Sequence, residues 1–213
     1  MIRAKGGRER ESGDRVVTPR PTVALVRHGQ TDWSKSGRHT GRTDVPLTET
    51  GRDQARLLGE LLGDWQEARV FTSPLVRAVE TCRLAGFDGA YEVLDDLREW
   101  DYGVYEGRTT SDIRKEIPGW SVWAHPVEEG ESVDDVGERA DRVISRIRDE
   151  DRDAIVFAHG HLLRILAARW CELAPKHGQQ LALDTATLSI LGYEREAPVV
   201  RMWNAPSQPR ATN

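Results

Sequence analysis

Short apolar runs alternate with amphipathic stretches over most of this chain. Runs rich in Val, Ile, Leu and Phe predict strands over residues 23–27, 69–72, 154–158, 187–193 and 199–203. Apolar positions at helical spacing predict helices over residues 74–85, 133–147 and 162–172, and one more that begins at Thr48 or Thr50. Ser132 and Asp135 predict a capping box at the start of the helix over residues 133–147. This alternation is typical of an α/β protein. We therefore expect a three-layer α/β/α sandwich with a mostly parallel central sheet.

Two polar segments interrupt the alternation. Residues 29–46 form a long loop, and loops of that length inside a compact domain are usually functional. Residues 100–123 lack a regular pattern apart from one short helix near 110–116, so we predict that they form a lid inserted into the sandwich. No repeat or internal linker is present. We expect one domain over residues 22–205, a disordered N-terminal extension over residues 1–21, and a flexible tail over residues 206–213.

Composition narrows the choice of protein class. Of 213 residues, 38% are apolar and 31% are charged, with a formal net charge of -5, which argues against a nucleic-acid surface. No stretch has the length of a membrane span, and residues 1–21 lack the apolar region of a secretory signal. Cys82 and Cys171 lie among apolar neighbours in predicted helices, which favours buried thiols. We therefore expect a cytoplasmic protein that binds neither nucleic acid nor a membrane.

Residues suited to phosphate chemistry follow four short strand-like segments, at 23–27, 69–72, 94–98 and 154–158. They are Arg27-His28-Gly29, Arg77, Glu99 and His159-Gly160-His161. The carboxyl ends of strands in an open α/β sheet border one crevice, so these side chains should converge. A neutral imidazole can attack phosphorus, and a guanidinium offers a planar pair of donors to two phosphate oxygens.

Each candidate also has a purely structural interpretation. The position of Arg77 is also compatible with a surface arginine, and Glu99 competes with Asp101 and Glu106, each of which is also suited to capping a turn. His159 and His161 could be metal ligands, but a zinc site needs a third ligand, and no HExxH or CxxC spacing exists. The histidines of the predicted loops around the pocket are candidates for substrate specificity or for a structural role: His39, His125 and His161.

Taken together, these motifs resemble the histidine phosphatase superfamily, which includes cofactor-dependent phosphoglycerate mutases and related phosphatases. The resemblance spans residues 23–203. It rests on the following stretches, in order: Leu25–Thr31, Gly37–Gly41 with Pro46–Thr48 and Gly51, Thr72–Pro74 with Arg77 and Thr81, Leu97–Gly103 with Tyr105–Gly107, Gly130–Ser132, and Ala158–Gly160. Several separated motifs in one order are far more specific than any single motif.

The resemblance implies a role for each matching residue. His28 would attack phosphorus through one ring nitrogen, while its other nitrogen donates to a backbone carbonyl, and a phosphohistidine would form. Arg27, Arg77 and His159 would surround the phosphoryl oxygens, and Glu99 would protonate the leaving alkoxide. The expected substrate-binding residues are Ser34, Thr40, Gly41 through its backbone, Tyr102, Gly160 and His161. No metal and no cofactor is expected, because arginines and histidines supply the positive field.

The resemblance leaves two activities to distinguish, mutase and phosphatase. The segment between Gly107 and Gly130 favours a phosphatase. A mutase needs an Arg- and Lys-rich insertion there to hold a carboxylate and exclude water, whereas this segment is short. We therefore expect a phosphatase for small phosphate monoesters, such as sugar phosphates or phosphoglycerate-type compounds. The alternatives are a phosphoglycerate mutase, a non-catalytic phospho-ligand-binding protein and a metal-dependent hydrolase. A homodimer is the assembly to test for.

Overall fold

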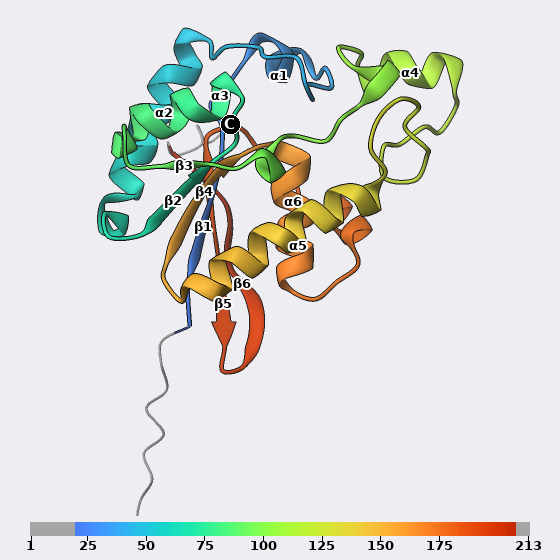
Figure 1. The fold of residues 1–213 in the computed structure, drawn as a ribbon. Coiled ribbons are helices and arrows are strands. Elements are labelled where there is room, and N and C mark those ends of the chain that lie inside the picture. The colour runs from blue at the N-terminus through green and yellow to red at the C-terminus, as the bar shows by residue number, and fades with distance from the viewer. Residues whose placement is uncertain (1–19, 208–213) are drawn as a thin grey trace, which may run out of the picture.

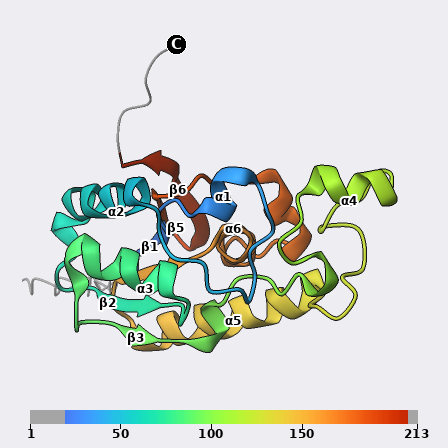
Figure 2. The ribbon, with the colours of Figure 1, turned by 90° about the horizontal axis from the view of Figure 1, so that it is seen from above.

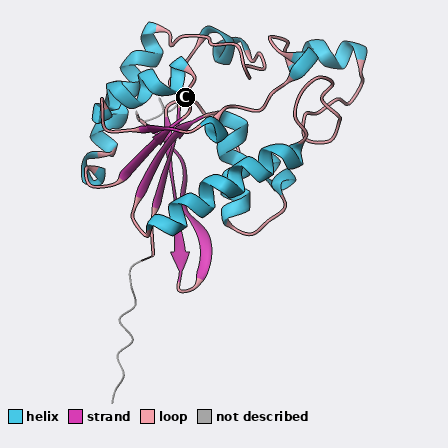
Figure 3. Cartoon of the chain, in the orientation of Figure 1, coloured by secondary structure: helices cyan, strands magenta, loops and turns pink. Residues whose placement is uncertain are grey.

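A single mixed sheet forms the centre of the molecule. The computed structural model describes residues 20–207, and its six strands lie in the order β3-β2-β4-β1-β5-β6 (Figures 1 and 3). Their bounds are Val23–Arg27 (β1), Arg69–Thr72 (β2), Glu92–Val93 (β3), Ala154–Ala158 (β4), Thr187–Glu194 (β5) and Ala197–Pro206 (β6). Strands β1 to β4 pair in parallel, whereas β5 and β6 pair antiparallel. The predicted mostly parallel sheet is confirmed.

Helices cover both faces of this sheet. They are α1 (Asp32–Ser36), α2 (Glu49–Leu61), α3 (Val76–Cys82), α4 (Thr110–Glu116), α5 (Val133–Glu150) and α6 (Gly160–Trp170). Seen from above, α2 and α3 lie on one side of the strands, and α5 and α6 lie on the other (Figure 2). The predicted three-layer sandwich is therefore confirmed. Helix α4 extends away from the layers, as the predicted lid requires (Figure 1).

Alternate residues of the central strands fill two separate cores. Val23 and Leu25 of β1 pack with α5 and α6, while Ala24 and Val26 pack with α2 and α3. All five residues of β4 are buried as well. A strand that is covered on both faces consists of consecutive apolar residues, because both sets of side chains are buried. For this reason β1 and β4 were recognisable from the sequence.

The third strand-like segment was predicted wrongly. Residues 94–98 were expected to form a strand that leads to Glu99, but β3 ends at Val93, and Asp95–Leu97 is a 3₁₀ turn. The carboxylate of Asp95 accepts hydrogen bonds from Arg98, and that of Asp96 accepts them from Arg142. Leu97 is fully buried and Leu94 packs against the core from its edge, so the segment folds as a polar turn between two apolar residues.

Other element boundaries differ by a few residues. The predicted loop over residues 29–46 contains the short helix α1. Thr31 and Ser34 form a capping box at the N-terminus of this helix. Helix α2 uses Thr48 as its N-cap, and α5 begins at the predicted capping box of Ser132 and Asp135. The helix expected over residues 74–85 begins at Val76 and continues past Cys82 as a π-helical turn.

The ends of the predicted domain lie close to those of the described chain. Most of the predicted extension and tail, residues 1–19 and 208–213, lies outside the described residues. Arg20 donates to the carbonyl of Glu196 and stacks on the ring of Tyr193. Pro206 is the last residue of β6. Both residues therefore belong to the folded part, although the predicted boundaries placed them outside it.

Candidate active site

A cavity of about 400 Å³ lies where β1 and β4 end. Its wall combines the end of β1, the loop around α1, the start of α6 and the lid. The predicted site residues on this wall are Arg27, His28, Ser34, Thr40, Glu99, Tyr102, Gly160 and His161. Arg77 and His159, both fully buried, lie beside it. The carboxyl ends of these strands therefore converge as the sequence predicted.

His28 is held in one tautomer by its own neighbour. Its Nδ1 lies 2.8 Å from the carbonyl oxygen of Gly29, which can only accept, so Nδ1 carries the proton and Nε2 has the free lone pair. Burial, together with the charges of Arg77 and Arg27, holds the pKa of His28 well below its usual value. The imidazole is therefore uncharged, which is the form that can act as a nucleophile.

Arg27 has a guanidinium that the protein satisfies only in part. Its Nη1 donates to the carbonyl of Leu183, whereas its Nε is buried without a hydrogen-bond partner among the described residues. A Cβ on Gly160 would lie 3.2 Å from its Cζ, so glycine at this position lets α6 begin close to the guanidinium. A buried N–H donor beside a cavity is a position for an anionic ligand.

Arg77 is fixed by backbone carbonyls of the loop that follows α1. It donates to the carbonyl oxygens of Thr40, Gly41 and Thr43 at 3.0 to 3.1 Å, and its Nε donates to Nδ1 of His159 at 3.2 Å. Arg77 is therefore not the surface arginine of the alternative interpretation, because its relative exposure is 0%.

His159 stands between Arg77 and the strand β2. Because its Nδ1 accepts from Arg77, its Nε2 carries the proton and donates to Oγ of Ser73 at 2.7 Å. Its ring centroid lies 5.2 Å from that of His28. Burial and the charge of Arg77 hold the pKa of His159 well below its usual value, so this imidazole is uncharged too.

Glu99 reaches the first turn of α6. Its Oε1 accepts from the backbone amides of Trp100 and Leu162, at 3.0 and 2.9 Å, and its Oε2 accepts from that of His161 at 3.0 Å. A carboxylate is favoured at a helix N-terminus, because unpaired amides and the helix dipole meet there. These bonds hold Glu99 on the cavity wall although its segment is no strand.

A cluster of His39, Tyr102 and His161 forms another part of the cavity wall. The Tyr102 hydroxyl lies 2.6 Å from Nδ1 of His161, and we assign the phenol as the donor, which places the imidazole proton on Nε2. Burial raises the pKa of Tyr102 well above its usual value and holds that of His161 well below it. Burial also lowers the pKa of His39, whose ring is tilted against that of Tyr102 with centroids 4.7 Å apart, to about 4.

The backbone amide of Gly41, which was predicted to donate to phosphate, has a protein partner in this structure. It donates instead to both carboxylate oxygens of Glu106, at 2.9 and 3.0 Å, and Gly41 does not line the cavity. Glu106 also accepts from the amide of Thr43. This carboxylate shapes the loop whose carbonyls hold Arg77, a role the sequence did not reveal.

Ser34 and Thr40 line the cavity with their hydroxyl protons already used. The Ser34 hydroxyl donates to the carbonyl of Thr31, and the Thr40 hydroxyl donates to that of Arg38. Either hydroxyl still has lone pairs, but donation to a phosphate would break an existing hydrogen bond. His125, another specificity candidate, bonds to Ser121 and is not part of the wall.

Some wall residues were not among the predicted site residues. They come from the loop after α1 and from the lid: Arg38, Arg114, Trp120 and Trp123. Their only sequence signal was their position in the two irregular segments. Within residues 20–207, no group of three His, Cys, Asp or Glu side chains could hold a metal ion. No helix of that same part is long and apolar enough to cross a membrane.

The fold and the site together define an α/β protein with a histidine–arginine site at the ends of parallel strands. Residues 23–206 match the sequence model of the histidine phosphatase superfamily (branch 1). The chain belongs to this superfamily, as its motifs predicted.

Two characterised relatives and one solved structure are similar to this chain. An acid phosphatase of Mycobacterium tuberculosis is 45% identical over 81% of this chain and 86% of its own length. A sedoheptulose 1,7-bisphosphatase of Saccharomyces cerevisiae is 40% identical over 70% of this chain and 67% of its own length. A solved structure of an open reading frame product from Mycobacterium tuberculosis has a TM-score of 0.84 and 40% identity, covering 88% of this chain and 99% of that one.

Proposed function

We propose that this protein hydrolyses small phosphate monoesters, sugar phosphates among them, through a phosphohistidine at His28. The observation that carries this proposal is the uncharged imidazole of His28, whose Nδ1–H is fixed on Gly29 while the unpartnered Nε of Arg27 lies on the same cavity wall. The relatives named as phosphatases support the substrate class.

In the first step, Nε2 of His28 attacks phosphorus and the bond between phosphorus and the ester oxygen breaks. Arg27, through its unpartnered Nε, and the charge of Arg77 stabilise the phosphoryl oxygens while the attacking and leaving atoms lie in line. His159 positions Arg77, since its Nδ1 accepts from that guanidinium and its N–H is donated to Ser73. Glu99 gives its proton to the departing alkoxide. Its Oε2 accepts one backbone amide only, which leaves a lone pair to hold that proton.

In the second step, a water molecule attacks the phosphorus of phospho-His28. Glu99, now a carboxylate, takes a proton from this water, and the nitrogen–phosphorus bond breaks. Inorganic phosphate leaves, and both His28 and Glu99 return to their starting forms. No step needs a metal ion, because guanidinium groups supply the positive charge, so dialysis against EDTA should leave the rate unchanged. A loss of rate that zinc or magnesium restores would contradict this part of the proposal.

Rapid quenching of the enzyme with a phosphorylated substrate tests the covalent step. We expect an acid-labile phosphoryl group on His28, and His28→Ala should abolish turnover while the protein remains folded. His177→Ala is the matched control, since His177 bonds to Gln180 and lies outside the cavity wall. Full phosphatase activity in His28→Ala would overturn the assignment of the nucleophile.

A further inference from the structure

The segment that carries Glu99 has neither a strand nor an α-helix to hold it in place. Strand β3 ends at Val93, a 3₁₀ turn occupies Asp95–Leu97, and the next turn begins at Gly103. The Glu99 carboxylate nevertheless lies on the cavity wall, within hydrogen-bond distance of the first amides of α6. A group that transfers a proton must be held to within about 0.5 Å, so contacts from outside the segment have to fix its backbone.

Arg139, on α5, binds the backbone on the N-terminal side of Glu99. Its Nη1 donates to the carbonyl oxygens of Asp96 and Arg98, at 2.7 and 3.0 Å, and its Nη2 donates to that of Glu99 at the longer distance of 3.5 Å. The Arg139 side chain is only 12% exposed. One guanidinium, with its planar array of donors, therefore joins carbonyls of the 3₁₀ turn to those of the residues that follow it.

Glu131, two residues before α5, binds the backbone on the C-terminal side of Glu99. Its Oε2 accepts from the amide of Asp101 at 3.0 Å, and its backbone carbonyl accepts from the Trp100 indole at 2.8 Å. The Glu131 amide in turn donates to the carbonyl of Asp101 at 3.0 Å. Glu131 also pairs with Arg139, which donates through Nε and Nη2 at 2.7 and 2.8 Å. This bidentate pair therefore holds residues on both sides of Glu99.

We propose that Arg139 and Glu131 are positioning residues, which hold Glu99 where it can exchange a proton with the substrate oxygen and with water. This inference rests on the proposed function, in which Glu99 is the general acid and then the general base. Neither residue of the pair lines the cavity, so each acts through the backbone of residues 96–101. Helix α5, whose apolar side chains belong to the core, is the fixed support.

The leaving group separates a positioning role from a merely structural one. Arg139→Gln should lower kcat/KM for glycerol 3-phosphate about tenfold more than that for p-nitrophenyl phosphate, because only the alkoxide needs the proton of Glu99. The ratio of the two values does not depend on the fraction of enzyme that is folded. Glu131→Gln should lower this ratio too, and it provides the test if Arg139→Gln does not fold. An unchanged ratio would overturn the inference.

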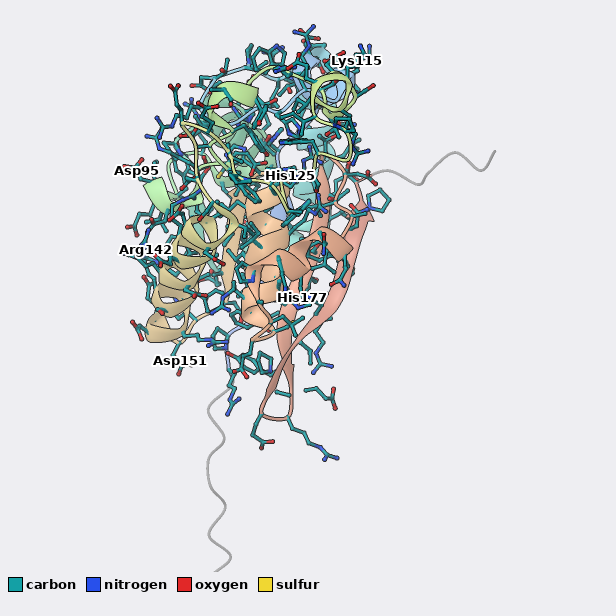
Figure 4. The ribbon with its side chains drawn as sticks, turned by 90° about the vertical axis from the view of Figure 1, so that its right-hand side faces the viewer. Asp95, Lys115, His125, Arg142, Asp151 and His177 are labelled. Carbon is teal, nitrogen blue, oxygen red and sulfur yellow. The ribbon has the colours of Figure 1, made fainter. Side chains whose placement is uncertain are left out.

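Arg142→Gln is the matched control. Arg142 lies on the same helix and loses the same charge, but it is 56% exposed and donates to the carboxylate of Asp96 instead of to the backbone. Figure 4 shows Arg142 near the outer edge of the molecule. We expect the ratio of the parent protein in this variant. An equal fall of the ratio in Arg142→Gln would contradict a specific role of Arg139.

A double-mutant cycle links the effect to Glu99. In the background of Glu99→Gln, Arg139→Gln should cause little further loss of kcat/KM for glycerol 3-phosphate, because the carboxylate that it positions has been removed. Losses that multiply would show that the two residues act independently, and the inference would then be wrong.

Amide hydrogen exchange tests the placement of Glu99 without any turnover. The amides of His161 and Leu162 donate to Glu99, so they should exchange several-fold faster in Arg139→Gln than in Arg142→Gln. Equal exchange rates would overturn the inference and leave the phosphatase assignment intact. Absence of hydrolysis of every substrate, p-nitrophenyl phosphate included, would overturn the phosphatase assignment, and the exchange rates would still decide whether the pair holds Glu99.

Discussion

Burial decides the chemistry of His28 and His159 at the scale of single residues. Both imidazoles lie beside Arg77, and burial together with that charge lowers their pKa values. Without burial, a histidine with a usual pKa near 6.5 would be partly protonated at neutral pH and a weaker nucleophile. The residue types were visible in the sequence, whereas their tautomers follow from Gly29 and Arg77 as hydrogen-bond partners.

Glu99→Gln should slow hydrolysis most for substrates whose leaving group needs a proton. We expect kcat/KM for glycerol 3-phosphate to fall by about 10²-fold or more, and that for p-nitrophenyl phosphate by much less, because nitrophenolate leaves without protonation. Glu116→Gln, a lid carboxylate outside the cavity wall, is the control. Equal losses on both substrates would remove Glu99 from the role of general acid.

At the scale of elements, the loop after α1 and the lid supply the parts of the active site that the sheet does not. Glu106 binds the amides of Gly41 and Thr43, and this loop in turn supplies the carbonyls that hold Arg77. Arg77 is thus positioned by a carboxylate that acts through the loop, since Arg77 itself donates to His159 and to the carbonyls of Thr40, Gly41 and Thr43. The sequence did not indicate that Arg77 depends on Glu106, because the loop and the lid have no regular hydrophobic pattern.

Glu106→Ala should displace Arg77 and lower kcat/KM by about tenfold or more, with a smaller effect on the midpoint of thermal unfolding. Glu106→Gln should retain part of the activity, because its amide oxygen can still accept the N–H of Gly41. Glu116→Ala provides the matched surface control, since Glu116 pairs with Arg108 at the far side of the lid. Full activity in Glu106→Ala would show that the loop holds Arg77 without this carboxylate.

The short lid predicts that phospho-His28 is hydrolysed faster than it transfers its phosphoryl group back to an organic product. Residues 107–130 contribute the single helix α4 besides turns, and no long insertion seals the cavity. Water should reach phospho-His28, so phosphate release from 3-phosphoglycerate should exceed its conversion to 2-phosphoglycerate in a side-by-side assay. Faster interconversion than release would instead support the mutase assignment.

At the scale of the whole molecule, buried histidines make stability depend on pH. The pKa values of His28, His39, His159 and His161 are all lowered by burial. Below pH 6.5 the unfolded chain binds protons that the folded protein does not, so stability falls as the pH falls. For His39 this loss is complete near its folded pKa of about 4 and amounts to at most about 3 kcal/mol.

Urea unfolding at pH 7, 6, 5 and 4 measures this dependence. We expect the free energy of unfolding to decrease steadily over that range, and His39→Phe to flatten the curve between pH 6.5 and 4. His177→Phe, at a half-buried position outside the cavity wall, is the matched control. A slope in His39→Phe as steep as that of the parent would show that His39 does not titrate differently on unfolding.

The sequence by itself determined the features that depend on neighbours along the chain. The continuous apolar runs of β1 and β4, the helical spacing in α5, the capping box of Ser132 and Asp135, and the motif Arg27-His28-Gly29 were all readable, because strand burial, helix periodicity and capping are local. Local pattern failed at residues 94–98, where a polar turn lies between Leu94 and Leu97 instead of a strand.

Only the tertiary structure decided how distant groups share their hydrogen bonds. The amide of Gly41 goes to Glu106, 65 residues away, and Arg77 reaches His159 across 82 residues. The lid brings Arg114 and Trp120 to a cavity whose base is made by β1. A donor's partner depends on which acceptors folding brings within about 3 Å of it, and no spacing along the chain encodes that distance.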